Sequence, residues 1–458
     1  MPVIKEREIS KAVHNMFVCN GRRTAPLKPV RDNQHISVLR AWFWPVSLVI
    51  VTWLATSILP VIVYDYDASI QKFWEEGSIE DTMAKLRLPS WEAAAVFFAF
   101  SAIQGALLEF IPGEIIYGPP TPTGERPQYR DNGMKCWFIT HIAWLILGPL
   151  TGVIKFGALY EMWGSFVSTT NAFALPFCVF LMWKGMYYPS SRDAVWTGRP
   201  AFDFFQGIEL HPRILGLNVK QLLNCRISMM GWSISQLAFA QAQYDRGQLS
   251  SGIIVCAALQ VLYLAKFFYW ESGYFASIDI IHDRCGYYII WGVLVWVPVI
   301  YCMAGFAAVE RPTEWSDLTA GALFAVGIVS LIVNYVADYQ RQLTRATNGN
   351  CTIWGRKPDC IKAEYTTTDG AVRKSLLLCS GFWGTSRHFN YVPELCLALC
   401  WCIPAASLRL LPIIYFVFLF CLLVDRAERD DIKCREKYGK YWDEYCKRVP
   451  YHILPYIY

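Results

Sequence analysis

The stretch AWFWPVSLVIVTWLATSILPVIVY (residues 41–64) contains no charged side chain. An α-helix needs about 20 mainly apolar residues to cross the hydrocarbon core of a bilayer, so this stretch is predicted to span a membrane. Comparable apolar runs lie at 91–112, 136–158, 166–186, 252–270, 285–309, 318–337 and 408–424, with weaker ones at 227–243 and 391–407. By the same length criterion, the sequence predicts an all-α polytopic membrane protein, a bundle of about ten transmembrane helices.

The overall composition agrees with this fold class. Of the 458 residues, 54% are hydrophobic and 17% are charged, and the mean hydropathy is positive. A soluble globular chain has about 25% charged residues, so this chain is unusually apolar. The net charge of +5 does not gather into a basic stripe on a soluble domain, and no nucleic-acid partner is expected.

The N-terminal segment 1–35 is predicted to be a separate cytosolic basic tail, followed by a membrane domain over 36–458. The first 40 residues contain eight Lys or Arg and only three acidic residues. Positively charged segments next to membrane spans tend to stay on the cytosolic side, which places the N-terminus in the cytosol.

The sixteen cysteines lie mostly inside the apolar runs. No CxxC pair is present and no histidines cluster at metal-ligand spacing, so these cysteines are interpreted as small core residues. The sequence predicts no metal site.

The most informative polar segment is LLLCSGFWGTSRHFNY (residues 376–391), which interrupts the apolar pattern. Aromatic rings beside fixed cationic and amide donors suit a flat anionic ligand such as a dinucleotide. An interfacial aromatic belt with snorkelling arginines is the alternative interpretation. Two other segments could join the same pocket: Arg341 and Arg345, which share a helix face, and the charged, aromatic tail 425–458. The tail is expected to fold back, and the TTDG sequence before residue 371 is expected to turn a hairpin.

Four longer motifs identify a family resemblance. They are GIELHPR (207–213), SIDIIHDRCGYYIIWG (277–292), SGFWGTSRHFNY (380–391) and RDDIKCREKYGKYWDEYCKRVPYHILPYIY (429–458). From about residue 118 to the C-terminus the chain resembles the membrane sterol reductases, which include the Δ14-, Δ7- and Δ24(28)-sterol reductases. NGNCTIWGRKP (348–358), RHFNY (387–391) and PPTPTGERPQYRDNG (119–133) are similar to the Δ7 branch of that family.

The resemblance implies a multi-pass enzyme of the endoplasmic reticulum that uses NADPH to saturate a ring double bond of a sterol taken from the bilayer. It places a cytosol-facing NADPH pocket in the C-terminal half, about 318–458, and is compatible with association with other sterol-pathway enzymes. The family's cofactor positions carry over onto residues that all look intact here: Arg341, Arg345, Leu378, Trp383, Asn390, Tyr391, Asp430, Cys434, Arg435, Glu436, Lys437, Tyr438 and Tyr445.

The expected reaction has two steps, because an isolated alkene is a poor hydride acceptor. Protonation must first create a tertiary carbocation, which a hydride then quenches, so a buried proton donor is required. The proton relay is predicted among Asp279, Asp283 and the neighbouring Tyr287 or Tyr288. The preferred substrate bond is Δ7 of a Δ5,7-sterol.

Four positions depart from the family pattern. Lys266 and Val293 stand where relatives commonly have acids, His211 replaces an Asn, and Pro393 replaces a Gly. A different proton relay explains these departures, and so does altered chemistry. The alternatives are therefore a Δ14-sterol reductase or a diverged member acting on another double bond or isomerising one. A non-catalytic sterol-binding protein is a further alternative, but an intact cofactor set argues against it.

Overall fold

The computed structural model describes residues 39–366, 372–406 and 410–457, so the expected basic tail at 1–35 lies outside the described residues. The chain divides into two compact units. The first unit comprises the described residues up to Leu249 together with Gln260–Arg311, and the second comprises Ser250–Leu259 and the described residues from Pro312 onward. Each unit is described by itself below.

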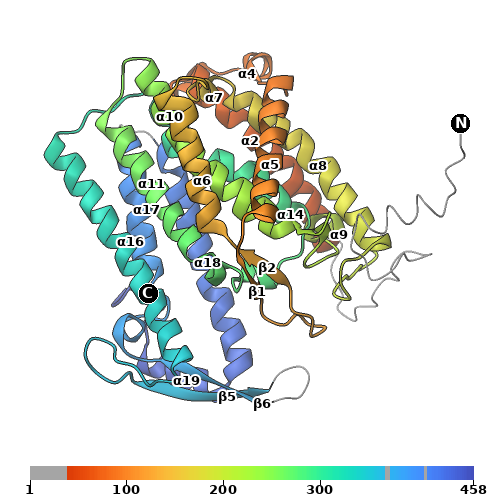
Figure 1. The fold of residues 1–458 in the computed structure, drawn as a ribbon, viewed down its shortest axis with the longest axis vertical. Coiled ribbons are helices and arrows are strands. Elements are labelled where there is room, and N and C mark those ends of the chain that lie inside the picture. Colours follow the sequence, from red (N-terminus) through yellow and green to blue (C-terminus); the bar gives the residue numbers. More distant parts are fainter. Residues whose placement is uncertain (1–38, 367–371, 407–409, 458) are drawn as a thin grey trace, which may run out of the picture. The chain divides into compact units, whose positions relative to one another are not determined.

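The first unit is a helical assembly with two small hairpins (Figure 1). Its longer helices are α2 (Trp44–Asp65), α5 (Trp91–Phe110), α6 (Gly133–Leu145), α8 (Trp163–Tyr187), α10 (Met230–Asp245) and α15 (Met303–Glu310). Its shorter helices are α3 (Ile70–Glu76), α4 (Ile79–Lys85), α7 (Ala158–Glu161), α9 (Pro200–Gln206), α12 (Glu271–Tyr274), α13 (Ile278–Ile281) and α14 (Tyr287–Trp291). Its π-helical segments are η1 (Leu39–Phe43), η2 (Ile146–Leu150), η3 (Gln221–Met229) and η4 (Gly292–Tyr301).

The two hairpins of the first unit are antiparallel and short. Strands β1 (Glu114–Tyr117) and β2 (Gln128–Asp131) pair just after α5, and β3 (Arg213–Ile214) and β4 (Leu217–Asn218) pair just before η3. Helix α11 (Ser251–Tyr269) begins in the second unit and ends in the first. Serine hydroxyls at residues 69, 78 and 90 accept backbone N–H groups at the starts of α3, α4 and α5, which fixes where these helices begin.

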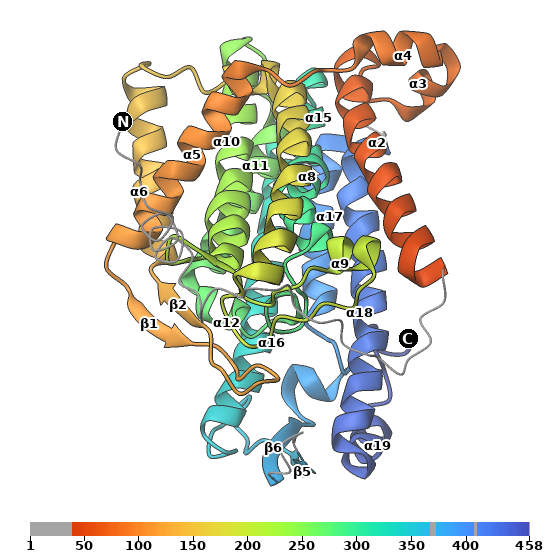
Figure 2. The same ribbon diagram turned by 90° about the vertical axis from the view of Figure 1, so that its right-hand side faces the viewer.

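The second unit contains three long helices and a hairpin. Helix α16 (Asp317–Ala346) packs along α17 (Tyr391–Ala406), and α17 packs on α18 (Ile414–Tyr438). The turns η5 (Gly381–Gly384) and η6 (Leu411–Ile413) precede α17 and α18 respectively. Strands β5 (Cys360–Thr366) and β6 (Val372–Leu378) lie with α19 (Lys440–Arg448) beyond the ends of α16 and α18 (Figure 2).

The expected hairpin at TTDG is confirmed by the pairing of β5 with β6. Thr366 lies opposite Val372, so the strands flank the expected turn, whose own residues lie outside the described ranges. The buried side of this hairpin forms a small core with the tail, in which Ile361, Leu377, Tyr438, Trp442 and Tyr445 pack together. This packing explains why the tail contains so many aromatic residues.

Each of the ten apolar stretches contains helix within its described residues, but about ten spans are not confirmed. Six described helices are long and apolar enough to cross a membrane: α2 with η1, α5, α6 with η2, α8, α11 and α16. The pair formed by Tyr287–Tyr301 and Met303–Glu310, bent by 41°, raises the number to seven. Helix α17 is shorter, η3 contains buried polar residues, and α18 is charged from Asp425 onward. The protein is therefore a mostly helical, multi-pass membrane protein with six or seven candidate spans, and three hairpins supplement the expected all-α bundle.

Candidate functional site

The C-terminal end of α16 carries two arginines one turn apart. The guanidinium of Arg341 lies over the ring of Trp383, with 4.2 Å from its central carbon to the ring centroid. Its Nη2 lies 3.4 Å from Asp338 Oδ1, and Asn390 Nδ2 donates to the same carboxylate oxygen at 3.2 Å. Arg345 is exposed on the next turn. Asp338 thus holds together one cation and one amide that come from separate parts of the chain.

Trp383 is fixed in place by α16 and by the tail. Its indole N–H donates to the carbonyl of Ala337 at 2.7 Å, and the hydroxyl of Tyr445 donates to the Trp383 carbonyl at 3.3 Å. The buried Gln340 accepts the backbone N–H of Phe382 at 3.0 Å. Gly381 has φ +62°, and a Cβ there would lie 2.3 Å from Gln340 Oε1, so the turn into η5 requires glycine. The indole ring of Trp383 is therefore held in a fixed orientation.

The end of the tail folds back onto the SGFWGTSRHFNY segment. The backbone N–H groups of Arg387 and His388 donate to the carbonyls of Tyr451 and His452, both at 2.9 Å. The Ser386 hydroxyl donates to the Ile453 carbonyl at 2.7 Å, and Arg387 Nη1 donates to the carbonyls of residues 449 and 450. Residues far apart in the sequence are joined here by backbone N–H groups and side-chain donors that bind backbone carbonyls of the tail.

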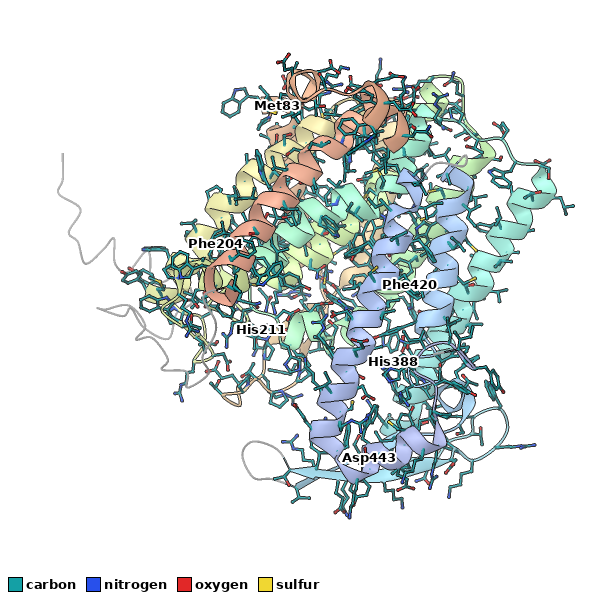
Figure 3. The ribbon with its side chains drawn as sticks, turned by 180° about the vertical axis from the view of Figure 1, so that it is seen from behind. Met83, Phe204, His211, His388, Phe420 and Asp443 are labelled. Carbon is teal, nitrogen blue, oxygen red and sulfur yellow. The ribbon has the colours of Figure 1, made fainter. Side chains whose placement is uncertain are left out.

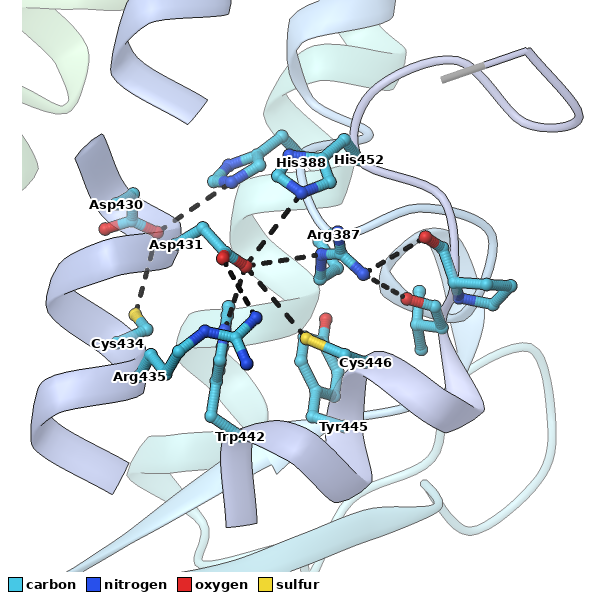
Figure 4. Close-up of polar contacts among 12 residues, drawn as sticks. Arg387, His388, Asp430, Asp431, Cys434, Arg435, Trp442, Tyr445, Cys446 and His452 are labelled. Carbon is cyan, nitrogen blue, oxygen red and sulfur yellow. Dashed lines mark hydrogen bonds and ion pairs between the residues drawn. The ribbon is translucent and has the colours of Figure 1, made fainter. Parts of the chain in front are cut away.

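Asp431 is the centre of this junction (Figure 4). Its carboxylate accepts the indole N–H of Trp442 at 2.9 Å and an N–H of Arg435 at 3.2 Å. Arg387 Nε and His452 Nε2 each lie 3.9 Å from it. Burial alone would raise the pKa of Asp431, but the hydrogen bonds from Trp442 and Arg435 and the charge of Arg387 outweigh burial, so its pKa is lowered. Asp431 is therefore ionised and binds side chains from the tail and from the SGFWGTSRHFNY segment.

The neighbouring Asp430 has the opposite electrostatic character. Cys434 Sγ lies 3.8 Å and His388 Nε2 lies 3.9 Å from Asp430 Oδ2. Burial raises the pKa of Asp430, with Arg341 opposing that rise. Burial also lowers the pKa of His388 to about 3, so its imidazole is neutral. Its ring stacks on that of Tyr391, with 5.1 Å between the ring centroids. Figure 3 marks the position of His388.

The side chains of this region fit a dinucleotide. Asn390 Oδ1 and His388 Nε2 are buried, and neither has a hydrogen-bond partner among the residues that the structure describes. Such atoms are rare in folded proteins, and a bound polar ligand is one way to satisfy them. The arginine pair supplies charge for phosphate, and the aromatic face supplies a surface for a flat ring.

The remaining sequence-predicted cofactor residues surround this cluster. Leu378 ends β6 and is buried, and Tyr438 is buried against Tyr365 of the hairpin. Lys437 lies over the Tyr365 ring at 4.2 Å, whereas Arg435 turns to Asp431 and Asp443, and Glu436 is exposed. All thirteen residues belong to the second unit.

The predicted proton relay lies in the first unit. Asp279 and Asp283 occur in α13 and in the loop after it, and both are partly buried. The ammonium group of Lys220, itself 1% exposed, donates to the backbone carbonyls of Asp279, Ile280 and Asp283. Of the two adjacent tyrosines, Tyr287 is buried and lies 3.2 Å from the Thr52 hydroxyl, while Tyr288 is 42% exposed. Lys220 therefore shapes the loop that carries both acids.

Two of the sequence motifs meet at this loop. Gly207 begins GIELHPR with φ +91°, and a Cβ on it would lie 2.3 Å from the backbone nitrogen of Gly286. The N–H of Cys285 donates to the Glu209 carbonyl at 2.9 Å, and the Glu209 carboxylate pairs with the buried Lys184 at 2.7 Å. The two motifs approach so closely that only glycines fit.

Two of the four positions that depart from the family pattern, His211 and Val293, are buried in the first unit. His211 Nδ1 lies 3.3 Å from the Tyr129 hydroxyl, and burial, with Lys220 and Arg284, lowers the pKa of His211 to about 3 (Figure 3). Val293 is buried and lines a small apolar cavity in the first unit, together with aromatic residues of α5 and α8. Within the described ranges, no group of His, Cys, Asp and Glu could hold a metal ion.

Sequence reasoning missed four residues that organise these sites: Asp338, Gln340, Asp431 and Lys220. Asp338 and Gln340 lie within one helical turn of Arg341, which is the one signal that could have marked them. Asp431 is adjacent to a predicted residue, but its partners are 44 residues upstream and 11 downstream. Nothing in the sequence pairs Lys220 with a loop some 60 residues away.

The chain is similar in sequence to known sterol reductases. Residues 42–458 match the model of the ergosterol biosynthesis ERG4/ERG24 family. The chain is 41% identical to the 7-dehydrocholesterol reductase of Arabidopsis thaliana over 84% of this chain and 89% of the relative. It is 32% identical to the Danio rerio protein of the same name, over 86% and 84%. It is 31% identical to the Delta(14)-sterol reductase of Methylotuvimicrobium alcaliphilum, over 87% and 88%.

A family match over nearly the whole chain, together with relatives above 30% identity, settles the class of protein. The chain belongs to the ERG4/ERG24 family of sterol reductases, and it is a membrane-embedded oxidoreductase of sterol biosynthesis.

Proposed function

We propose that this enzyme uses NADPH to reduce the Δ7 double bond of a Δ5,7-sterol. The main support for NADPH as the cofactor is the cluster of Arg341, Trp383 and Asn390. The buried amide oxygen of Asn390 has no hydrogen-bond partner among the described residues. The relatives named 7-dehydrocholesterol reductase, one of them 41% identical, support the choice of bond.

In this proposal the second unit binds and orients the cofactor. Arg341 and Arg345 bind phosphate groups, since guanidinium forks match phosphate oxygens. Trp383 and Tyr391 provide ring surfaces, and Asn390 and His388 offer hydrogen-bonding groups to the ligand. Asp430, Cys434, Lys437, Tyr438 and Tyr445 close the site from the tail, with Leu378, Arg435 and Glu436 beside them. When bound, NADPH supplies the hydride.

The first unit supplies the proton. Protonation of the alkene forms one C–H bond and leaves a tertiary carbocation, and hydride transfer then forms the second C–H bond and consumes the positive charge. Asp279, Asp283 and Tyr288 are the proposed donors and relay, with Lys220 holding the acid-bearing loop.

The proposed location is the endoplasmic reticulum membrane, with the N-terminus in the cytosol and the sterol entering from the bilayer. Other sterol-pathway enzymes are proposed associates, because substrate and product are too apolar to diffuse through water. Residues 36–458 form the catalytic domain in this proposal, with the cofactor half at about 318–458.

A second candidate is reduction of a Δ14 bond. It is favoured by relatives named Delta(14)-sterol reductase, which match 87–89% of this chain. The apolar cavity lined by Val293 also allows altered chemistry on another double bond.

Sterol profiling tests both candidates. The chain is expressed in yeast, whose membrane sterols include Δ5,7-dienes, and sterols are identified by mass spectrometry and diene ultraviolet absorption. Conversion of the dienes to Δ5-sterols is expected for wild type and should be lost in Arg345→Ala. The matched control is Arg429→Ala, which removes an exposed guanidinium that pairs with Asp425 on the same helix. Unchanged dienes together with consumption of Δ14-sterols would favour the second candidate.

A further inference from the structure

We infer that the first unit contains a binding site for the phosphodiester headgroup of a membrane phospholipid. The site is a cavity of about 180 Å³ between the last turn of α5 and the hairpins β1–β2 and β3–β4. Pockets for drug-sized ligands are roughly 300–1,000 Å³, so this cavity accommodates a small polar group. It contains none of the proposed cofactor or proton-relay residues.

The cavity is lined by groups that donate hydrogen bonds. Arg130 and Arg213 contribute guanidinium groups, and Asn218 contributes an amide. The Nε and Nη2 atoms of Arg213 donate to the Gly216 carbonyl at 3.1 and 2.9 Å, which fixes the orientation of its guanidinium. Asn218 Oδ1 accepts the Gln221 N–H at 3.1 Å, leaving the Asn218 NH₂ group as a donor. Two cations and an amide suit the oxygens of a phosphate.

These donors are held in place before any ligand binds. The buried Gln221 bridges to the strand that carries Arg130: its amide donates to the Arg130 carbonyl at 2.8 Å and accepts the Arg130 N–H at 3.3 Å. Strand β2 is thereby tied to η3, and the Arg130 side chain starts from a fixed backbone. A pre-organised site loses less conformational freedom when it binds.

One acidic residue gives the cavity its second recognition element. Glu109 Oε1 lies 3.8 Å from Arg130 Nη2, which is an ion-pair distance but too long for a hydrogen bond. The carboxylate is therefore available to an ammonium group next to the phosphate. A zwitterionic headgroup such as phosphoethanolamine matches this combination of two cations and one anion.

The surroundings of the cavity point to a lipid as the source of the phosphate. Leu108 and Glu109 are in the last turn of α5, a candidate membrane span, so the cavity lies at the end of that span, where headgroups lie. Phe110, Ile115 and Leu215 next to it are 80%, 44% and 66% exposed. Exposed apolar side chains beside a phosphate-binding cavity provide contacts for acyl chains, which free phosphate lacks.

Native mass spectrometry of the purified, delipidated full chain tests this inference. Phosphatidylethanolamine is titrated into wild type, Arg130→Gln and Arg126→Gln. Arg126 is the matched control because it lies just before β2 in the same hairpin and its Nε donates to the Gly118 carbonyl, yet it does not line the cavity. We expect Arg130→Gln to weaken lipid binding about tenfold, equivalent to about 1.4 kcal/mol, and Arg126→Gln to leave it unchanged.

Two further measurements make the result specific. Glu109→Gln should shift preference from phosphatidylethanolamine towards phosphatidylglycerol, which lacks the amine. Phosphoethanolamine and inorganic phosphate, added at the same concentration, should compete weakly. Equal binding by Arg130→Gln and wild type would overturn the site, and equally strong competition by free phosphate would overturn the lipid assignment. Because the melting temperature of each variant is measured in parallel, misfolding is distinguished from a lost contact.

Discussion

The ion pair between Arg226 and Glu271 is entirely buried in the first unit, and breaking it should cost more stability than any exposed pair. Both side chains are 0% exposed. Arg226 Nη1 donates to Glu271 Oε1, and Nη2 donates to Glu271 Oε2 at 2.8 Å and to Asn132 Oδ1 at 2.9 Å. Asn132 in turn donates to carbonyls at the end of α5, so one network joins α5, α6, η3 and α12.

Replacing Arg226 by Met leaves a buried carboxylate without its partner, which costs roughly 3–5 kcal/mol. Replacing both residues, Arg226→Met with Glu271→Leu, removes the uncompensated charge, so the double variant should be more stable than either single variant. At about 2 °C per kcal/mol for a unit of this size, the single variant should melt about 6–10 °C below wild type. The control Arg429→Met breaks an exposed pair worth at most about 1 kcal/mol.

The assay is thermal unfolding of the detergent-solubilised protein, followed by far-ultraviolet circular dichroism at one scan rate for all variants. A double-mutant cycle then gives the coupling energy between the two residues. If the double variant melts no higher than the less stable single variant, the pair contributes packing alone and the electrostatic reasoning is wrong.

Three further changes give distinct expectations. Lys220→Met should lower kcat more than it raises KM, because the loop that contains Asp279 and Asp283 loses three hydrogen bonds. Lys220→Arg should restore part of the activity. Equal kcat in Lys220→Met and wild type would contradict this prediction. Gly207→Ala should lower the free energy of unfolding by at least about 2 kcal/mol, because the new Cβ is strained at positive φ and overlaps Gly286. The control Gly124→Ala is also at positive φ but in open space, so it should cost only the backbone strain. Comparing the melting temperatures of the two variants tests this difference. The pKa of Asp431 is lowered in the folded protein, so its carboxylate stabilises the fold above the unfolded pKa of about 3.9, and this contribution is lost as the pH falls below that value. Asp431→Asn should therefore flatten the pH dependence of melting below about pH 4, and an unchanged profile would rule out this role.

Much of the protein's architecture was predictable from local composition. Each apolar run contains helix within the described residues, because a backbone in lipid must satisfy its hydrogen bonds within its own segment. The hairpin flanking TTDG was predictable because turn residues separate two short strands. The prediction of about ten spans is not confirmed: six or seven described helices are long and apolar enough to cross a membrane, while η3 contains buried polar groups and α18 contains charges.

The candidate site was predictable as a set of residue types but not as an arrangement. Arg341, Trp383 and Asn390 could be named from motifs, yet their common attachment to Asp338 depends on the packing of η5 and α17 against α16. The contact between Asp431 and Arg387 likewise forms only when the tail folds back on residues 386–388.

Span length and motif identity are local properties of the chain, so the amino-acid order was enough to identify a helical membrane protein of the sterol reductase family. Which charges are paired, which polar atoms are left for a ligand and which motifs touch became known from the folded chain. A pairing between residues dozens of positions apart depends on how whole helices pack, and the same side chain can be a solvated charge, a buried partner or a ligand contact according to that packing.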